Sequence, residues 1–192
     1  MAKLKIYSFP DDVLAKKAKP IDRVDRELRK LADDMLETMY SAPGVGLAAN
    51  QVGILKQIVV MDTDYETEDH ELEDAQDDKT MPAGGEVVSG VIKNPKPIIL
   101  INPKIIYREG EILFKEGCLS VPGYSCEVKR SEKIKVEYQD ADGLTKTLAL
   151  DGLPAVCVQH ELDHLDGKLF IERLSPIKKE MAIKKVLRER ED

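Results

Sequence analysis

Apolar residues recur at helical spacing along the segment that ends near residue 40. The apolar positions are Leu28, Leu31, Ala32, Met35 and Met39. Residues three and four apart lie on one face of an α-helix, so the pattern predicts an amphipathic helix whose apolar face belongs to the core. Asp22 or Asp25 is placed to cap its N-terminus. We expect this helix to run through Met39.

Apolar stretches and alternating patterns predict β-strands in the middle of the chain. Residues 57–61 and 97–101 are apolar runs typical of strands, and 111–114 has a strand-like pattern as well. Residues 134–138 and 145–150 follow a strand pattern on either side of Asp142-Gly143. Because that dipeptide favours a tight turn, the two segments predict an antiparallel hairpin.

Two more helices are predicted in the last quarter of the chain. Leu153-Pro154 opens one of them, since proline is tolerated in a first helical turn, and Gly167 marks its end. Ser175-Pro176 begins the other, which runs to about Arg190. The mixture of strands and helices predicts the α+β class.

Composition favours one intracellular domain over residues 1–192. The hydrophobic fraction of 42% is enough to bury one core. Three cysteines, an odd number, argue against a disulfide framework and favour a reducing compartment. No apolar run approaches the ~18 residues that span a bilayer. We therefore expect a cytoplasmic protein that has no membrane partner. The absence of a large apolar surface stripe favours a monomer, and no direct binding to DNA is expected.

The negative charge of the chain comes from one segment. Residues 62–78 contain ten acids and no lysine or arginine, so without them the formal charge of −7 would become +3. From Asp62 to Asn94 the chain is first acidic and then rich in glycine, without a steady apolar period. This composition predicts a solvated surface loop inserted between two strands.

The candidate chemistry is concentrated in His160-Glu161-Leu162-Asp163-His164. Residues i and i+4 share a helical face, so His160 and His164 can reach one metal ion while Glu161 lies beside it as a general base. The motif predicts metal-assisted hydrolysis. Only three histidines occur in 192 residues, and two of them are here.

A catalytic metal site of this kind typically needs a third protein ligand. One familiar extension of the motif has a histidine six residues after the second one, but this chain has Phe170. Cys157 lies too far along the helix from His164 and is expected to be a buried apolar residue, and His70 is expected at the surface. Cys118, at a strand end, and Cys126, in a turn-rich segment from Val121, remain. The strand end favours Cys118.

Three motifs in this order resemble the peptide deformylase family. They are a glycine-alanine loop from Gly44 to Gln51, the Glu116-Gly117-Cys118-Leu119-Ser120 segment, and the helix motif from Gln159 to His164. The resemblance covers residues 4 to 187 and implies antiparallel β-sheets packed around a central helix that carries both histidines. The acidic loop departs from the more compact pattern of the family.

The resemblance implies an enzyme that removes the formyl group from N-formylmethionyl nascent peptides and releases formate. It implies Cys118, His160 and His164 as ligands of one divalent ion, ferrous iron physiologically, with zinc or nickel as replacements. Glu161 would be the general base, and the Gln51 amide and the Leu119 backbone N–H would stabilise the oxyanion. The residues implied for substrate binding are Val45, Gly46, Gly117, Leu153, Val156 and Cys157. Glu116 and Arg130 are an expected ion pair near the metal.

Two other functions remain open on the sequence. A metallopeptidase would use the same histidine and glutamate chemistry on internal peptide bonds. A ribosome-binding or nucleic-acid-binding module would use the basic residues of the last helix, although interleaved acids leave residues 176–192 at only +2. The second role is compatible with deformylation.

Overall fold

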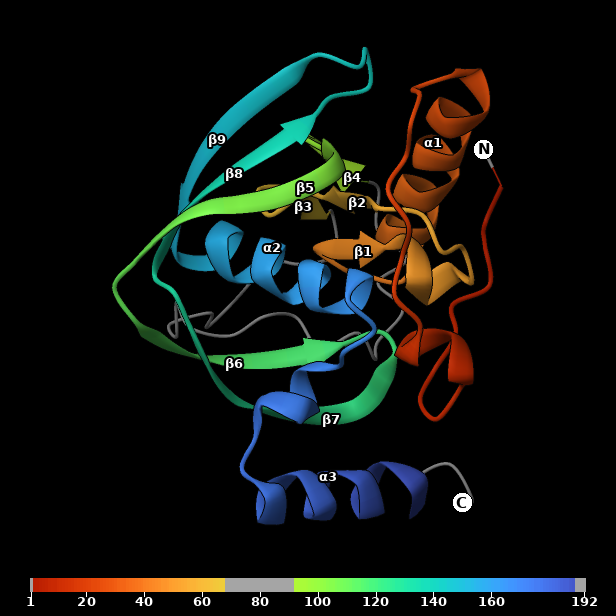
Figure 1. Ribbon diagram of the computed structural model, residues 1–192. Helices are drawn as coiled ribbons and strands as arrows, with labels where there is room; N and C mark the ends of the chain where they lie inside the picture. Colours follow the sequence, from red (N-terminus) through yellow and green to blue (C-terminus); the bar gives the residue numbers. More distant parts are fainter. Residues whose placement is uncertain (1, 68–91, 189–192) are drawn as a thin grey trace.

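The computed structural model describes residues 2–67 and 92–188 and has α+β architecture (Figure 1). The helices are α1 (Arg26–Ser41), α2 (Gly152–Leu165) and α3 (Pro176–Arg188), with short 3-10 helices η1 (Asp12–Ala15), η2 (Ala49–Val52) and η3 (Phe170–Arg173). The strands are β1 (Gly46–Ala48), β2 (Ile58–Met61), β3 (Glu66–Thr67), β4 (Ile92–Lys93), β5 (Ile98–Glu109), β6 (Ile112–Cys118), β7 (Val121–Arg130), β8 (Lys133–Gln139) and β9 (Thr145–Asp151). Within these ranges, no helix has the length and apolar character needed to cross a membrane.

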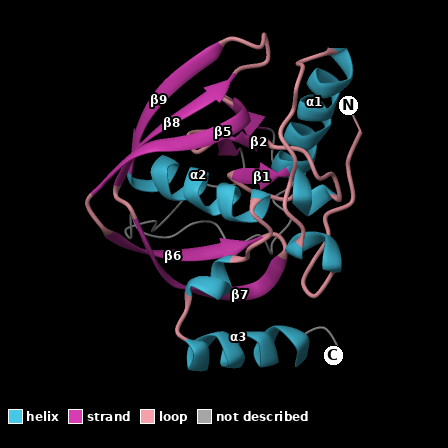
Figure 2. Ribbon diagram, in the orientation of Figure 1, coloured by secondary structure: helices cyan, strands magenta, loops and turns pink. Residues whose placement is uncertain are grey.

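The strands form antiparallel sheets. Five of them follow the order β1-β2-β5-β8-β9, while β6 pairs with β7 and β3 with β4. Figure 2 shows α2 between the five-stranded sheet and the β6–β7 hairpin, with α3 on the outer side of that hairpin. The antiparallel sheets and helices agree with the predicted α+β class.

The two faces of the large sheet are covered by different helices. On β2, Ile58 and Val60 pack with α1, whereas Val59 and Met61 pack in the core cluster that contains α2. Alternate side chains of a strand point to opposite faces, so the apolar run of β2 is buried on both sides. Its burial explains why this short strand contains no polar position.

The predicted apolar face of helix α1 is confirmed. Four of the five predicted positions are fully buried, and Leu31 is partly buried against the same cluster. Asp25 is the N-cap, because its side chain accepts a hydrogen bond from the backbone N–H of Leu28 at 2.8 Å. The helix ends at Ser41, two residues beyond the predicted end.

The predicted hairpin and the two later helices are also present. Strands β8 and β9 pair along their whole length, with Gly143 at φ +79° in the turn. Helix α2 ends at Leu165, and Gly167, at φ +73°, donates its N–H to the carbonyl of His164 at 2.9 Å. Helix α3 is described to Arg188, so the predicted end at residue 190 lies outside the described residues.

Two segments differ from the sequence-based expectation. The predicted strand at 97–101 continues to Glu109, because Asn102 takes φ +51° and its side chain bonds Ile21 and Gln139, so the chain passes a bulge without leaving the sheet. The segment from Val121, which its residues predict to be turn-rich, begins strand β7. Gly123 permits this with φ +76°.

The acidic segment is described only at its ends. Residues 68–91, which include His70 and most of the predicted 62–94 loop, lie outside the described residues. At the described ends, β3 and β4 form a short antiparallel ladder in which Thr67 is opposite Ile92. Asp62 is not solvated as predicted, because it is buried and accepts hydrogen bonds from Tyr40 Oη at 2.6 Å and Lys96 N at 2.7 Å.

Candidate metal centre

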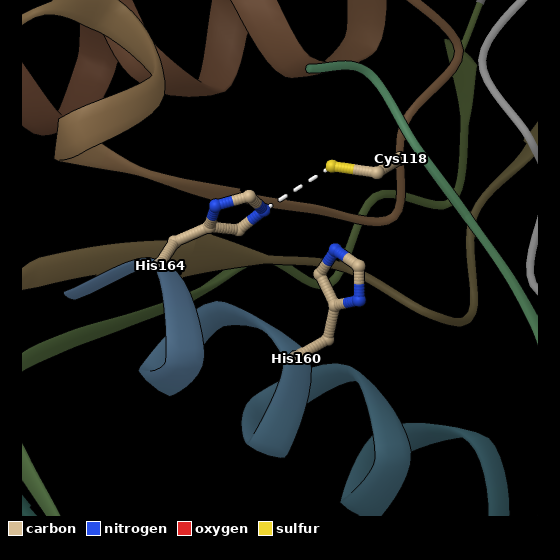
Figure 3. A group of neighbouring side chains, drawn as sticks. All are labelled: Cys118, His160 and His164. Carbon is tan, nitrogen blue, oxygen red and sulfur yellow. Dashed lines mark hydrogen bonds between the residues drawn. The ribbon is translucent and has the colours of Figure 1, made fainter. Parts of the chain in front are cut away.

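Three potential metal ligands converge at the end of β6 and the middle of α2. Figure 3 shows Cys118 facing His160 and His164, which lie one turn apart on α2. One ligand atom from each residue lies within 4.8 Å of the other two, and Cys118 Sγ is 3.2 Å from His164 Nε2. All three side chains are buried. The structure therefore brings the three predicted ligands into one cluster.

A buried acid orients His160 from the side opposite the cluster. Its Nδ1 lies 2.8 Å from Glu116 Oε2, so Glu116 accepts the Nδ1–H bond and Nε2 is left for the cluster. Arg130 in turn donates to both carboxylate oxygens of Glu116, at 2.6 and 2.9 Å. This confirms the predicted pair of Glu116 and Arg130.

The same network reaches a second acid on α2. Arg130 donates to Asp163 at 2.6 Å, and Arg173 donates to both carboxylate oxygens of Asp163 at 2.5 Å. Arg130 is almost fully buried, and its charge is balanced by Glu116 and Asp163. These bonds fix the position of α2 against the β6–β7 hairpin, and with it the position of the histidines.

Gln51 approaches the cysteine from η2. Its Nε2 lies 3.6 Å from Cys118 Sγ and 3.2 Å from Ser120 Oγ, while its Oε1 accepts the backbone N–H of Ala48 at 2.9 Å. The backbone N–H of Ser120 also points to the sulfur, at 3.4 Å. Because both ends of the Gln51 amide are engaged, its N–H groups are held toward the cluster.

Glu161 lies against the backbone of β1. A Cβ placed on Gly46 would come within 2.6 Å of Glu161 Oε1 and 2.8 Å of Cys157 Sγ, so only glycine permits this close approach. Burial raises the pKa of Glu161 to about 7, although neighbouring His160 opposes this effect. Glu161 lines the same narrow cleft as Cys118 and His160.

The donor set and its surroundings fit a divalent cation. A sulfur and two imidazole nitrogens are typical zinc-type ligands. Burial lowers the pKa of His164 well below its usual range, which favours the neutral form that binds a metal. Burial also lowers the pKa of His160, but the neighbouring Cys118 and Glu116 have the larger combined effect and raise it well above its usual range. Negative groups therefore outweigh burial in their effect on this ring. Among the described residues, His164 Nδ1 and Glu161 Oε2 are buried without a hydrogen-bond partner.

A narrow cleft opens beside the cluster. Its lining residues include predicted site residues from all three motifs, namely Val45, Gly46, Gln51, Gly117, Cys118, Leu119, His160 and Glu161. Three predicted substrate-binding residues, Leu153, Val156 and Cys157, do not line it. Val156 and Cys157 are buried in the core cluster that includes Val45, and Leu153 packs against that cluster. Cys157 Sγ is 3.6 Å from the carbonyl oxygen of Val45, directly behind the wall of the cleft.

The other cysteines are not part of the cluster. Cys126 is half-buried on β7 opposite Glu116, and burial, aided by that acid, raises its pKa to about 11. Cys157 is fully buried among apolar side chains, as predicted. These positions favour Cys118 among the three cysteines.

Sequence reasoning did not identify three contacts of this site. They are the hydrogen bond between Glu116 and His160, the contact of Asp163 with Arg130, and the contact of Ser120 with Gln51. One usable signal was present, because a ligand histidine usually donates its second N–H to a carboxylate, and Glu116 stands two residues before Cys118.

Comparisons with known proteins give a consistent result. The model of the polypeptide deformylase family matches residues 3–180. Peptide deformylase 2 of Xanthomonas axonopodis pv. citri is 42% identical over 193 residues, covering 99% of this chain and 98% of its own. A peptide deformylase structure from Ehrlichia chaffeensis has a TM-score of 0.80 and 37% identity, covering 99% of this chain and 98% of its own. A second structure from that organism, in complex with actinonin, has a TM-score of 0.79 and 38% identity over 98% of both chains. These matches show that the chain belongs to the polypeptide deformylase family.

Proposed function

We propose that this chain removes the formyl group from the N-terminal methionine of newly made peptides by hydrolysis, which releases formate and leaves a free N-terminal amine. The observation that carries the proposal is the buried cluster of Cys118, His160 and His164, next to a cleft that Glu161 lines together with Cys118 and His160. Its relatives are named peptide deformylases, which supports this reaction over hydrolysis of internal peptide bonds.

The proposed reaction divides the chemistry among a few side chains. A divalent cation held by the three donors would supply Lewis acidity and activate water near neutral pH. Glu161 takes a proton from the attacking water and returns it to the leaving amine. The Gln51 Nε2–H and the backbone N–H of Leu119 donate to the oxygen of the formyl group as negative charge develops there. The engaged Oε1 of Gln51 supports this assignment, because it fixes the direction of the amide.

The proposed substrate lies along the backbone at the mouth of the cleft. Gly46 and Gly117 both line it and would offer backbone hydrogen bonds to an extended peptide. Val45 supplies an apolar wall for the methionine side chain. Leu153, Val156 and Cys157 stay predicted pocket residues, and their packing next to Val45 supports that prediction.

We propose ferrous iron as the physiological metal. Support comes from the family, whereas the Cys and His₂ donor set by itself also suits zinc, and nickel is a further replacement. The free state of all three cysteines supports a cytoplasmic location. The monomeric state and a ribosome contact through α3 stay predictions.

Replacement of Glu161 tests the reaction. Glu161→Gln keeps the size of the side chain and the three metal donors but removes the base, so formate release should fall roughly 10²- to 10⁴-fold while bound metal is retained. Metal content and formate release from a formyl-Met peptide are measured on the same preparation. Glu137→Gln, an exposed change on β8, is the matched control and should keep full activity.

The choice of substrate separates the proposal from a metallopeptidase. The wild-type protein should act on formyl-Met peptides and leave unblocked peptides and internal peptide bonds intact. Full activity of Glu161→Gln, or cleavage of unblocked peptides at a comparable rate, contradicts the proposal.

A further inference from the structure

A second cavity lies apart from the cleft and shares no lining residue with it. It has a volume of about 630 Å³ and is formed where β5 and β7 end, against Gln159 of α2 and the segment that follows this helix. Its lining contains the five cations Arg108, Lys129, Arg130, Lys168 and Arg173. No residue that is given a chemical step or a substrate contact in the proposed deformylation lines this cavity, although Arg130 and Arg173 belong to the network that positions α2.

Three of these cations are balanced by acids. Arg130 and Arg173 share Glu116 and Asp163 in the buried network described above. Lys129 pairs with Glu111 at 2.5 Å. Glu172 is the other acid of the lining. Its Oε2 lies 3.7 Å from Nζ of Lys179, a residue outside the lining.

The remaining two cations form no salt bridge with an acid in the described part of the chain. Arg108 is held by neutral groups, because its Nη1 donates to Gln159 Oε1 at 2.8 Å and to Ser131 Oγ at 3.4 Å. Lys168 is exposed and forms no salt bridge with a described residue. Arg108 and Lys168 therefore contribute positive charge that no salt bridge among the described residues takes up, and the lining as a whole has more cations than the two acids Glu111 and Glu172.

Arg108 is held in a fixed orientation in the cavity. Gln159 itself is fixed by bonds to the backbone of Ser131 and Ala155, so Arg108 is oriented before any ligand arrives. Burial, and then the repulsion of Arg173, lower the pKa of Arg108, while the attraction of Asp163 opposes them. An oriented guanidinium in a positive cavity is suited to a tetrahedral oxyanion, which it can bind through two N–H groups.

We propose that this cavity binds the phosphate group of a small phosphorylated molecule or of inorganic phosphate, with Arg108 and Lys168 as its charged contacts. A phosphate group has more oxygens than a carboxylate, so it can accept hydrogen bonds from the Arg108 guanidinium and the Lys168 ammonium together. The volume of the cavity exceeds that of one phosphate, so an attached organic group can be accommodated.

Calorimetric titration of the metal-loaded full chain with inorganic phosphate tests this site. We expect saturable binding to one site, weakened by added salt. Arg108→Gln and Lys168→Gln should each weaken binding roughly tenfold, and the double variant should abolish it. Arg108→Lys keeps the charge and should recover part of the affinity. Arg23→Gln, the same change at an exposed arginine before α1, should have no effect.

Further titrations identify the ligand and the place where it binds. AMP binding more tightly than phosphate, with adenosine inert, would indicate a phosphate ester, and equal affinities would indicate free phosphate; both results support the site. Thermal melting of each variant verifies that it is folded. Phosphate affinity that is unchanged in the folded double variant would place the anion elsewhere, such as at the metal, and would overturn the proposal. Absence of binding at millimolar phosphate would overturn it as well.

Discussion

Cys118 and Cys126 stand on the same hairpin but in different environments. Cys118 Sγ accepts hydrogen bonds from the Gln51 side chain and the Ser120 backbone and lies beside His164. Cys126 is not part of the group of potential metal ligands. We predict that Cys118→Ser loses bound metal and formate release severely, because a hydroxyl is a much poorer soft ligand than a thiolate. Cys126→Ser is the control and should keep both, measured after dialysis. Loss of metal from Cys126→Ser alone would show that the ligand assignment is wrong.

At the scale of residues, local spacing predicted the donors but not the groups that orient them. His160 and His164 are four residues apart, so a helix is sufficient to bring them together. Glu116 contacts His160 across 44 positions of sequence, and Arg130 contacts Asp163 across 33. These bonds depend on how α2 packs against the β6–β7 hairpin, which no local pattern specifies.

Helix α1 is an element whose stability effect can be predicted. Met35 is fully buried between α1 and the large sheet, so Met35→Ala removes packing and leaves a cavity. We expect a loss of about 2–5 kcal/mol in the free energy of unfolding, measured by urea denaturation. Met181→Ala, the same change at a side chain on α3 that is 66% exposed, should stay within about 0.5 kcal/mol. Similar losses for both variants would contradict the assigned packing.

At the scale of elements, helices were predicted more closely than strands. Periodic apolar positions and a cap define α1, and Gly167 defines the end of α2. Strands β5 and β7 contain Asn102, Pro122 and Gly123, which are residues typical of turns. Tertiary hydrogen bonds of Asn102 and pairing with β6 keep these segments in sheets, so residue preference alone gave the wrong boundaries.

The molecule as a whole should tolerate removal of most of its acidic segment. Strands β3 and β4 bring Thr67 opposite Ile92, so a short linker can join them without disturbing the large sheet. We predict that replacing residues 69–90 by a short Gly/Ser linker changes kcat on a formyl-Met peptide by less than about tenfold, or about 1.4 kcal/mol in barrier. KM for acidic peptides is the more sensitive quantity, and its change should shrink at high salt.

A scrambled segment of the same composition is the control for the deletion. It keeps the charge and length while changing the order of residues, so it separates an electrostatic effect from a specific contact. A folded, metal-loaded deletion protein whose kcat fell a thousandfold would show that the segment helps to build the active site.

The enclosure of α2 has a consequence for native-state hydrogen exchange. This helix lies between the large sheet and the β6–β7 hairpin, and most of its residues from Ala155 to Leu165 are buried. Its amide protons can reach solvent only if one of these layers separates, an event close in free energy to global unfolding. Helix α3 buries only Ala182 and Val186, so its amides can exchange through local fraying. Helix α2 therefore belongs to the slowest-exchanging unit of the fold, and α3 to a faster one.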